Sequence, residues 1–156
     1  DLADEKVIYG VSGLEFKPDR TITAAEFEAL LARVCGKNDD AYKSYLDKQE
    51  PITREEMAYL MSRIYEESHE KAEKGDMSAY KDYENAAYKE ELAKCVKLGL
   101  LKGYDDGTLN PSGTATRAEA AAVILRFRLV MQGINIAPDK ADIEMNQQTE
   151  LKFFDR

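Results

Sequence analysis

The sequence contains few of the residue types on which common chemistries depend. It has no tryptophan, one histidine and two cysteines, Cys35 and Cys95, and neither cysteine has a partner at metal-ligand spacing. The cysteines are therefore either buried free thiols or one disulfide. No nucleophile motif or phosphate-binding loop occurs either. We therefore predict a protein that is not an enzyme and has neither a cofactor nor a metal site.

An excess of basic residues and long apolar runs are also lacking. The sequence has 22 Lys and Arg against 30 Asp and Glu, a net charge of −8, which argues against nucleic acid because phosphate binding needs a dense basic face. No apolar run approaches the roughly 20 residues that span a bilayer, so no membrane span is expected. The start, DLADEKVIYG, does not resemble a signal peptide, and any export signal would lie outside this sequence.

One segment is present three times without gaps. The copies are ITAAEFEALLARV from residue 22, ITREEMAYLMSRI from 52 and ATRAEAAAVILRF from 115. Each has a threonine followed three residues later by a glutamate, the pattern of a capping box in which each side chain bonds the other residue's N–H. The capping pairs are Thr23 with Glu26, Thr53 with Glu56, and Thr116 with Glu119. Three such boxes in register predict three homologous helices.

Apolar residues then recur at helical spacing after each cap. The stripes are Phe27, Leu30, Leu31 and Val34; Met57, Leu60, Met61 and Ile64; and Ala120, Val123, Ile124 and Phe127. Because the three stripes have the same register, each helix is expected to bury one face in a shared central bundle. The sequence, with 44% hydrophobic and 33% charged residues, therefore predicts a single all-α domain over residues 1–156.

The three copies differ in what precedes them. Before the third, an amphipathic helix ends at Gly99 and a tight glycine loop spans residues 103–111, giving a unit of helix, loop and capped helix. Before the first, GVSGLEFKPDRTIT is an abbreviated loop. Before the second, DDAYKSYLDKQEP has room for one or two helical turns and no glycine loop. The second capped helix is expected to extend to about Gly75.

Two of the copies carry an arginine immediately after the capping threonine, Arg54 and Arg117, whereas the first has Ala24. A cation is mildly disfavoured at a helix N-terminus, where the dipole is positive. Together with exposed first-turn N–H groups, each arginine would form a combined anion site. The structural alternative is that Arg117 pairs with a nearby acid such as Asp105 or Asp106, and Arg54 with Glu50.

The third unit, LAKCVKLGLLKGYDDGTLNPSGTATRAEAAAVILRF, closely resembles an S-layer homology repeat. The resemblance is strong for residues 79–128, moderate for 7–36 and limited to PITREEMAYLMSRI in the middle. It divides the chain into repeat 1 (about 1–36), a degenerate repeat 2 (about 37–75), repeat 3 (about 76–131) and a C-terminal extension (132–156). The end, LKFFDR, looks like the opening of a further repeat.

This resemblance implies a pseudo-threefold assembly of degenerate helix-loop-helix repeats around a central three-helix bundle. It also implies a non-catalytic cell-surface anchoring module, extracellular at a bacterial cell wall or S-layer, that binds an anionic, often pyruvylated, secondary cell-wall polysaccharide. The family's principal ligand residue is the arginine of the TRAE motif. That role is carried over to Arg117, which we interpret as the main binding residue, and to Arg54.

Two loop residues are further candidates for binding. Gly103 offers a backbone N–H to a sugar and Tyr104 a surface for a sugar ring, unless the glycine serves loop geometry and the tyrosine the core. An EF-hand is excluded because Lys102 and Gly113 would occupy its first and last ligand positions. The second interpretation is a structural or protein-interaction domain that has lost glycan binding, which Ala24 and the shortened middle copy favour.

Overall fold

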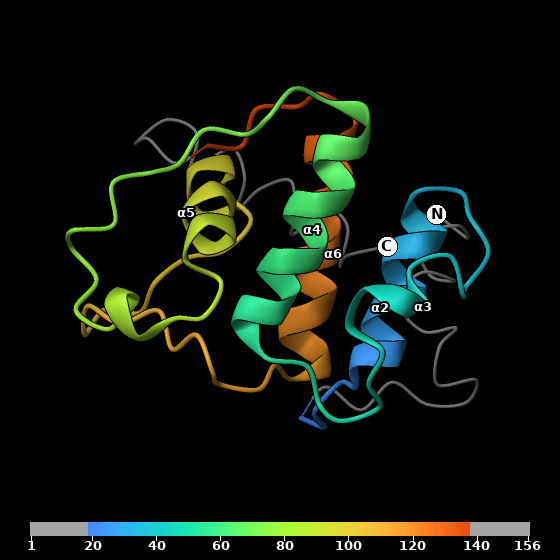
Figure 1. Ribbon diagram of the computed structural model, residues 1–156, viewed down its shortest axis with the longest axis horizontal. Coiled ribbons are helices and arrows are strands. Elements are labelled where there is room, and N and C mark those ends of the chain that lie inside the picture. The colour runs from blue at the N-terminus through green and yellow to red at the C-terminus, as the bar shows by residue number, and fades with distance from the viewer. Residues whose placement is uncertain (1–18, 138–156) are drawn as a thin grey trace.

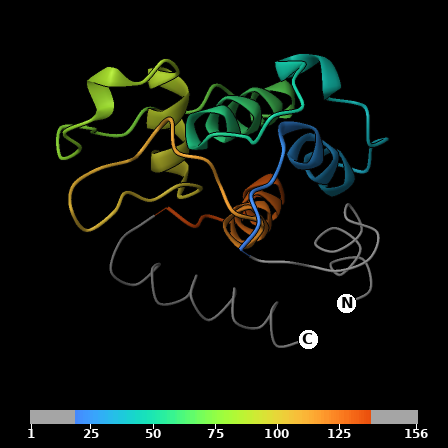
Figure 2. The same cartoon turned by 90° about the horizontal axis from the view of Figure 1, so that it is seen from below.

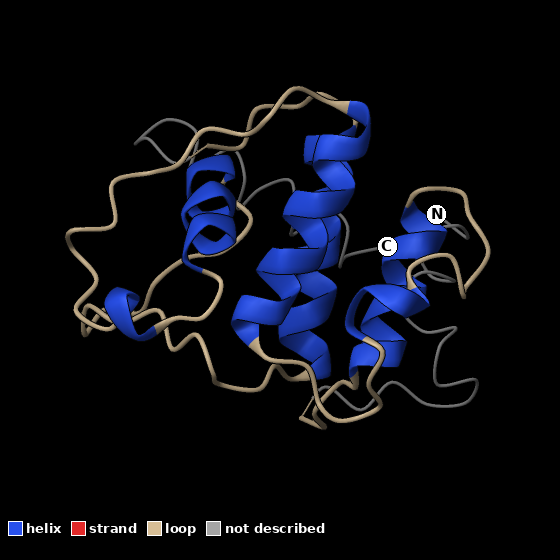
Figure 3. Cartoon of the chain, viewed as in Figure 1, coloured by secondary structure: helices blue, strands red, loops and turns tan. Residues whose placement is uncertain are grey.

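The computed structural model describes residues 19–137, and within this range the chain is helical without strands (Figure 1, Figure 3). The predicted all-α class is therefore confirmed for the described residues. The loop at the start of repeat 1 and the predicted opening LKFFDR lie outside them. The helices are α2 (Ala24–Val34), α3 (Lys43–Leu46), α4 (Arg54–Ser68), the short 3-10 helix η1 (Tyr83–Asn85), α5 (Lys89–Leu98) and α6 (Arg117–Met131).

The three predicted capping boxes are present at the starts of α2, α4 and α6. Each threonine hydroxyl accepts a hydrogen bond from the glutamate amide, at 3.1, 3.3 and 3.1 Å respectively. Each glutamate carboxylate in turn accepts from the threonine amide, at 3.0, 2.9 and 3.3 Å. The helix starts are therefore fixed locally, as the sequence predicts.

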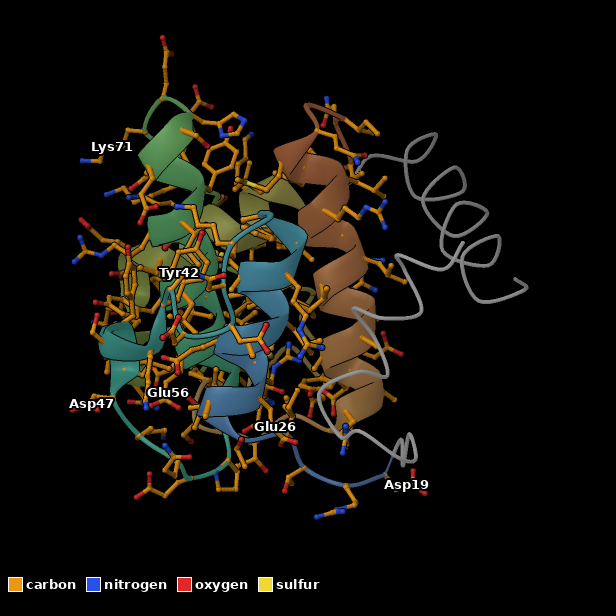
Figure 4. The ribbon with its side chains drawn as sticks, turned by 90° about the vertical axis from the view of Figure 1, so that its right-hand side faces the viewer. Asp19, Glu26, Tyr42, Asp47, Glu56 and Lys71 are labelled. Atoms are coloured by element: carbon orange, nitrogen blue, oxygen red, sulfur yellow. The ribbon has the colours of Figure 1, made fainter. Side chains whose placement is uncertain are left out.

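A closed ring of backbone hydrogen bonds joins the residues that precede the three caps. Ile22 donates to the carbonyl of Ala115 at 3.1 Å, Ala115 donates to Ile52 at 3.1 Å, and Ile52 donates to Ile22 at 2.9 Å. The three helices consequently begin at one end of the molecule and run in the same direction (Figure 1). Glu26 and Glu56 lie at this end in Figure 4. Each helix start thus lies at a junction with the segment that precedes another capping box.

The predicted apolar stripes form the core between these helices. All twelve stripe residues are buried except Val34, which is half-buried, and Phe27 and Phe127 are fully enclosed. Helix α2 contacts α4 and α6, and α5 packs against α4. Figure 2 shows α2 and α5 on opposite sides of α4 and α6. Both cysteines are free thiols, with Cys95 buried and Cys35 half-buried.

Helix α4 ends seven residues before the Gly75 boundary that we predicted, at Ser68. The capping residue His69 is already extended, with φ −130° and ψ 166°. The following segment is held by tertiary contacts, because the Glu66 carboxylate accepts from the Ala72 amide at 2.9 Å and pairs with the buried Lys94 at 3.0 Å. The predicted helix end was wrong because helix propensity alone gives no information on these tertiary contacts, one of which is with α5.

Candidate functional site

The glycine loop of repeat 3 lies against the start of α4, not against that of α6. The Arg54 guanidinium donates from Nε to the Leu109 carbonyl at 2.8 Å and from Nη2 to the Lys102 carbonyl at 2.7 Å. Its central carbon lies 4.8 Å from the centroid of the Tyr104 ring. The structure therefore brings Arg54, Gly103 and Tyr104 together, and we call this group the Arg54 junction.

The alternative predicted from the sequence instead placed this loop beside Arg117, the arginine that follows it, through a pair with Asp105 or Asp106. The hydrogen-bond ring explains the difference, because each helix start pairs with the segment before another cap. The Arg54 amide donates to Gly113 and the Glu55 amide to Pro111, both at 2.9 Å, whereas the Arg117 amide donates to Arg20 at 2.8 Å. Arg117 therefore belongs to the junction between α6 and α2.

The first-turn N–H groups of α4 are already satisfied within the protein. The amides of Arg54 and Glu55 donate to the backbone carbonyls of Gly113 and Pro111, and the Glu56 amide donates to the Thr53 hydroxyl. The predicted anion site that combines an arginine with exposed first-turn N–H groups was therefore wrong for α4. Any anion held at this junction is held by the side chain of Arg54.

Arg54 is 7% exposed and interacts with an acid from another repeat. Its Nη1 lies 3.6 Å from Oε2 of Glu119, the capping glutamate of α6, so its acidic partner is not the predicted Glu50. A guanidinium carries five N–H donors, and two of those of Arg54 are hydrogen-bonded to the loop carbonyls. Tyr104, whose ring lies over the guanidinium, is 45% exposed. The junction therefore presents a fixed cation beside an accessible aromatic ring.

Residues outside the predicted motifs hold the loop in shape. The two carboxylate oxygens of Asp82 accept from the amides of Leu109 and Asn110, each at 2.9 Å. Asp106 accepts from the side chain of Thr108 at 2.6 Å, and this hydrogen bond holds the pKa of Asp106 below its usual value. The two carbonyls that fix Arg54 belong to the main chain and have no signature in the sequence, which is why sequence reasoning missed them.

Gly103 is required by a close approach of Tyr80. A Cβ atom at this position would lie 2.2 Å from Cε1 of the Tyr80 ring, far inside van der Waals contact. This contact supports the structural interpretation of the glycine, in which it allows the loop to pass under the ring. Tyr80 itself was not among the residues singled out from the sequence.

We expect Gly103→Ala to lower the free energy of unfolding by about 2 kcal/mol, because the ring or the loop must shift to admit the methyl group. Urea denaturation measures the change. Gly75→Ala is the matched control, since a Cβ there meets its nearest atoms at 3.5 Å, and it should leave stability nearly unchanged. Equal effects of the two substitutions would contradict the steric explanation.

The junction of Arg117 follows the same charge pattern. Arg117 is 6% exposed, and its Nη1 lies 4.0 Å from Oε2 of Glu26, the capping glutamate of α2. The nearby acid is therefore Glu26, whereas the predicted alternatives were Asp105 and Asp106. Residues 10–18 of the repeat 1 loop, which precedes this junction, lie outside the described residues.

At the third junction the cation comes from a different part of the sequence. The first helical residue of α2 is Ala24, which is fully buried. The capping glutamate of α4, Glu56, pairs with Lys48 at 2.8 Å. Each capping glutamate thus lies near one cation, although at this junction a lysine outside the repeat register supplies it. Lys48 offers a point charge rather than the planar fork of an arginine.

Residues 19–137 contain neither a metal-binding cluster nor a membrane-spanning helix. They contain no group of three or more His, Cys, Asp or Glu side chains that could hold a metal ion. Within the same range, no helix has the length and apolar character needed to cross a membrane.

Comparison with known proteins identifies the segment that carries this loop. Residues 79–121 match the family model of the S-layer homology domain. This segment, which contains Gly103, Tyr104, Arg117 and Glu119, therefore belongs to the S-layer homology family.

The chain is also similar to parts of much longer proteins. It is 26% identical to an amylopullulanase of Thermoanaerobacterium thermosulfurigenes, over 79% of this chain and 8% of that protein. It is 28% identical to the exoglucanase XynX of Acetivibrio thermocellus, over 79% of this chain and 14% of that protein. It is 31% identical to a cellulosome-anchoring protein of the same organism, over 60% of this chain and 22% of that protein. The chain thus matches a small fraction of each relative.

Proposed function

We propose that this chain is a non-catalytic module that anchors a protein at a bacterial cell surface by binding an anionic cell-wall polysaccharide. The S-layer homology match and the similarity to a cellulosome-anchoring protein support the anchoring role and an extracellular location. The observation that carries the binding proposal is the Arg54 junction, where a guanidinium fixed by two carbonyls lies beside an exposed tyrosine ring.

We further propose that three degenerate repeats surround a pseudo-threefold axis, with α2, α4 and α6 as the central bundle. Support comes from the closed hydrogen-bond ring and from the first-turn amides of the three helices, which donate to equivalent carbonyls of Glu50, Gly113 and Arg20. Each of these carbonyls lies three residues before a capping threonine. We also propose the repeat boundaries near residues 36, 75 and 131 that the sequence predicts.

At the Arg54 junction, an acidic sugar would rest against the exposed ring of Tyr104 and direct its carboxylate to the guanidinium. Among residues 19–137, hydrogen bonds use two of the five N–H donors of Arg54, and charge-assisted hydrogen bonds to a carboxylate are stronger than neutral ones. A pyruvate ketal on the polysaccharide would provide such a carboxylate. Arg117, at the junction between α6 and α2, is proposed as a second anion site of the same kind.

Co-sedimentation with bacterial cell walls tests this function. Wild-type protein is expected to sediment with walls that carry the acidic polysaccharide and to stay in solution with walls from which it has been extracted. Tyr104→Ala should weaken sedimentation while leaving the fold intact, because this side chain is 45% exposed, and Tyr104→Phe should retain it. Equal sedimentation with both wall preparations would contradict binding to this polymer.

The second candidate function is a helical structural or protein-interaction domain without glycan binding. The burial of Arg54 and the satisfied first-turn amides of α4 favour it, because both also have a purely structural explanation. This candidate predicts that wild-type protein stays in solution with both wall preparations.

A further inference from the structure

A cavity lies at the end of the helix bundle opposite to the capping boxes. It has a volume of about 640 Å³, within the range of small-molecule sites, and is lined by residues from the C-terminal ends of α2, α4 and α6. Tyr42, labelled in Figure 4, contributes to it and is 3% exposed. The cavity is separate from the Arg54 junction, with which it shares no lining residue.

Cations predominate around this cavity although the chain as a whole is acidic. Arg33, Lys37 and Arg128 line it, and the only acidic lining residue among the described residues is Glu67. Glu67 accepts a hydrogen bond from the Tyr45 hydroxyl, which raises the pKa of Tyr45 to about 12. The whole chain has a net charge of −8, so the excess of cations around the cavity is opposite in sign to the charge of the chain.

Two of these cations have positions that the fold itself fixes. Arg33 is bound to Asp39 by two hydrogen bonds, from Nε at 2.9 Å and from Nη2 at 2.8 Å. Lys37 follows Gly36, whose φ of 69° reverses the chain after α2, and its ammonium lies 5.5 Å from the centroid of the Tyr42 ring. The cations are thus held around an aromatic wall.

Cations near the C-terminal ends of helices complement the helix dipoles, which explains why they lie here. This explanation does not require a cavity. The combination of an apolar wall, formed by Tyr42 and Ile64, with Lys37 and Arg128 matches the surface of an acidic sugar, which has an apolar ring face and a charged substituent. We propose that this cavity binds an anionic monosaccharide unit whose carboxylate or phosphate lies between Lys37 and Arg128.

Cys35 provides a direct reporter of occupancy, because it lines the cavity and is half-buried whereas Cys95 is fully enclosed. The rate of Cys35 modification by N-ethylmaleimide would be measured with glucuronate, glucose 6-phosphate or neutral glucose. At about twice its dissociation constant, a ligand leaves about one third of the protein unoccupied, so modification should slow about threefold. The two acidic sugars distinguish a carboxylate from a phosphate ligand, and glucose should have no effect.

Lys37→Gln and Arg128→Gln test whether the charges are responsible, since both replace a charge with a polar group of similar size. Each should remove most of the protection, whereas Arg63→Gln, at an exposed arginine that does not line the cavity, should retain it. Cys35→Ser should abolish the modification signal. Equal protection by glucose and the acidic sugars, no protection by either acid, or full protection in Lys37→Gln would each overturn the proposal.

Discussion

Arg54→Ala is expected to weaken binding to the acidic wall polysaccharide by about tenfold to a hundredfold, the loss that accompanies removal of one charge-assisted contact. The substitution removes the cation beside Tyr104 and releases the carbonyls of Lys102 and Leu109 that Arg54 now holds. The dissociation constant, measured by titration calorimetry with purified polysaccharide, gives the effect on binding.

The control for this substitution is Arg63→Ala. Arg63 is an exposed arginine of the same helix, α4, and its guanidinium lies 5.3 Å from the Tyr59 ring centroid. It matches Arg54 in charge and in its aromatic neighbour, and its loss should leave affinity nearly unchanged. Arg54→Lys keeps the charge but not the planar fork, so an intermediate affinity is expected. A folded Arg54→Ala protein that binds as tightly as wild type would contradict the proposed role.

Glu28→Gln is expected to stabilise the protein at pH 8 by about 3 kcal/mol while changing stability little at pH 4. Glu28 is 2% exposed, and its carboxylate accepts a hydrogen bond from the Leu46 amide at 3.3 Å. The pKa of Glu28 is raised from 4.5 to about 7, with burial as the largest cause. Nearby Asp47 and Glu56 also raise this pKa, whereas the Leu46 amide and Lys43 lower it.

The direction of the pH dependence follows from this shift. The native carboxyl group holds its proton more tightly than the unfolded one, so its contribution to stability is present below pH 4.5 and is lost as the pH rises to about 7. Glutamine stays neutral and removes this dependence. Urea denaturation from pH 4 to pH 8 measures it, with exposed Glu73→Gln as the control. A stability difference between Glu28→Gln and wild type that does not change with pH would contradict the account.

The parts of the fold that depend on local chemistry were predictable from the sequence. The capping boxes join residues three apart, and the buried stripes follow helical spacing, so both are visible in a single copy of the repeat. The end of α4 was not predictable in this way. It depends on Glu66, which is bound both to Ala72 and to Lys94 of α5.

The sequence proposes the residues of the candidate site, but it does not predict their arrangement. Arg54, Arg117, Gly103 and Tyr104 were all proposed from the sequence, whereas the contact between the glycine loop and Arg54 was not. Order along the chain favours Arg117, but the hydrogen-bond ring places the loop beside Arg54. Lys48, which lies outside the repeat register, could be recognised only from its contact with Glu56.

The central claim is that the Arg54 junction binds the acidic polysaccharide, and NMR titration of the wild-type protein tests it most directly. On addition of purified polysaccharide, the side-chain Nε–H resonance of Arg54 and the ring resonances of Tyr104 should shift and saturate together. The ring resonances of Tyr65, which is stacked on His69 at the opposite end of α4, should not move. Binding that leaves the Arg54 and Tyr104 resonances unchanged would contradict the claim.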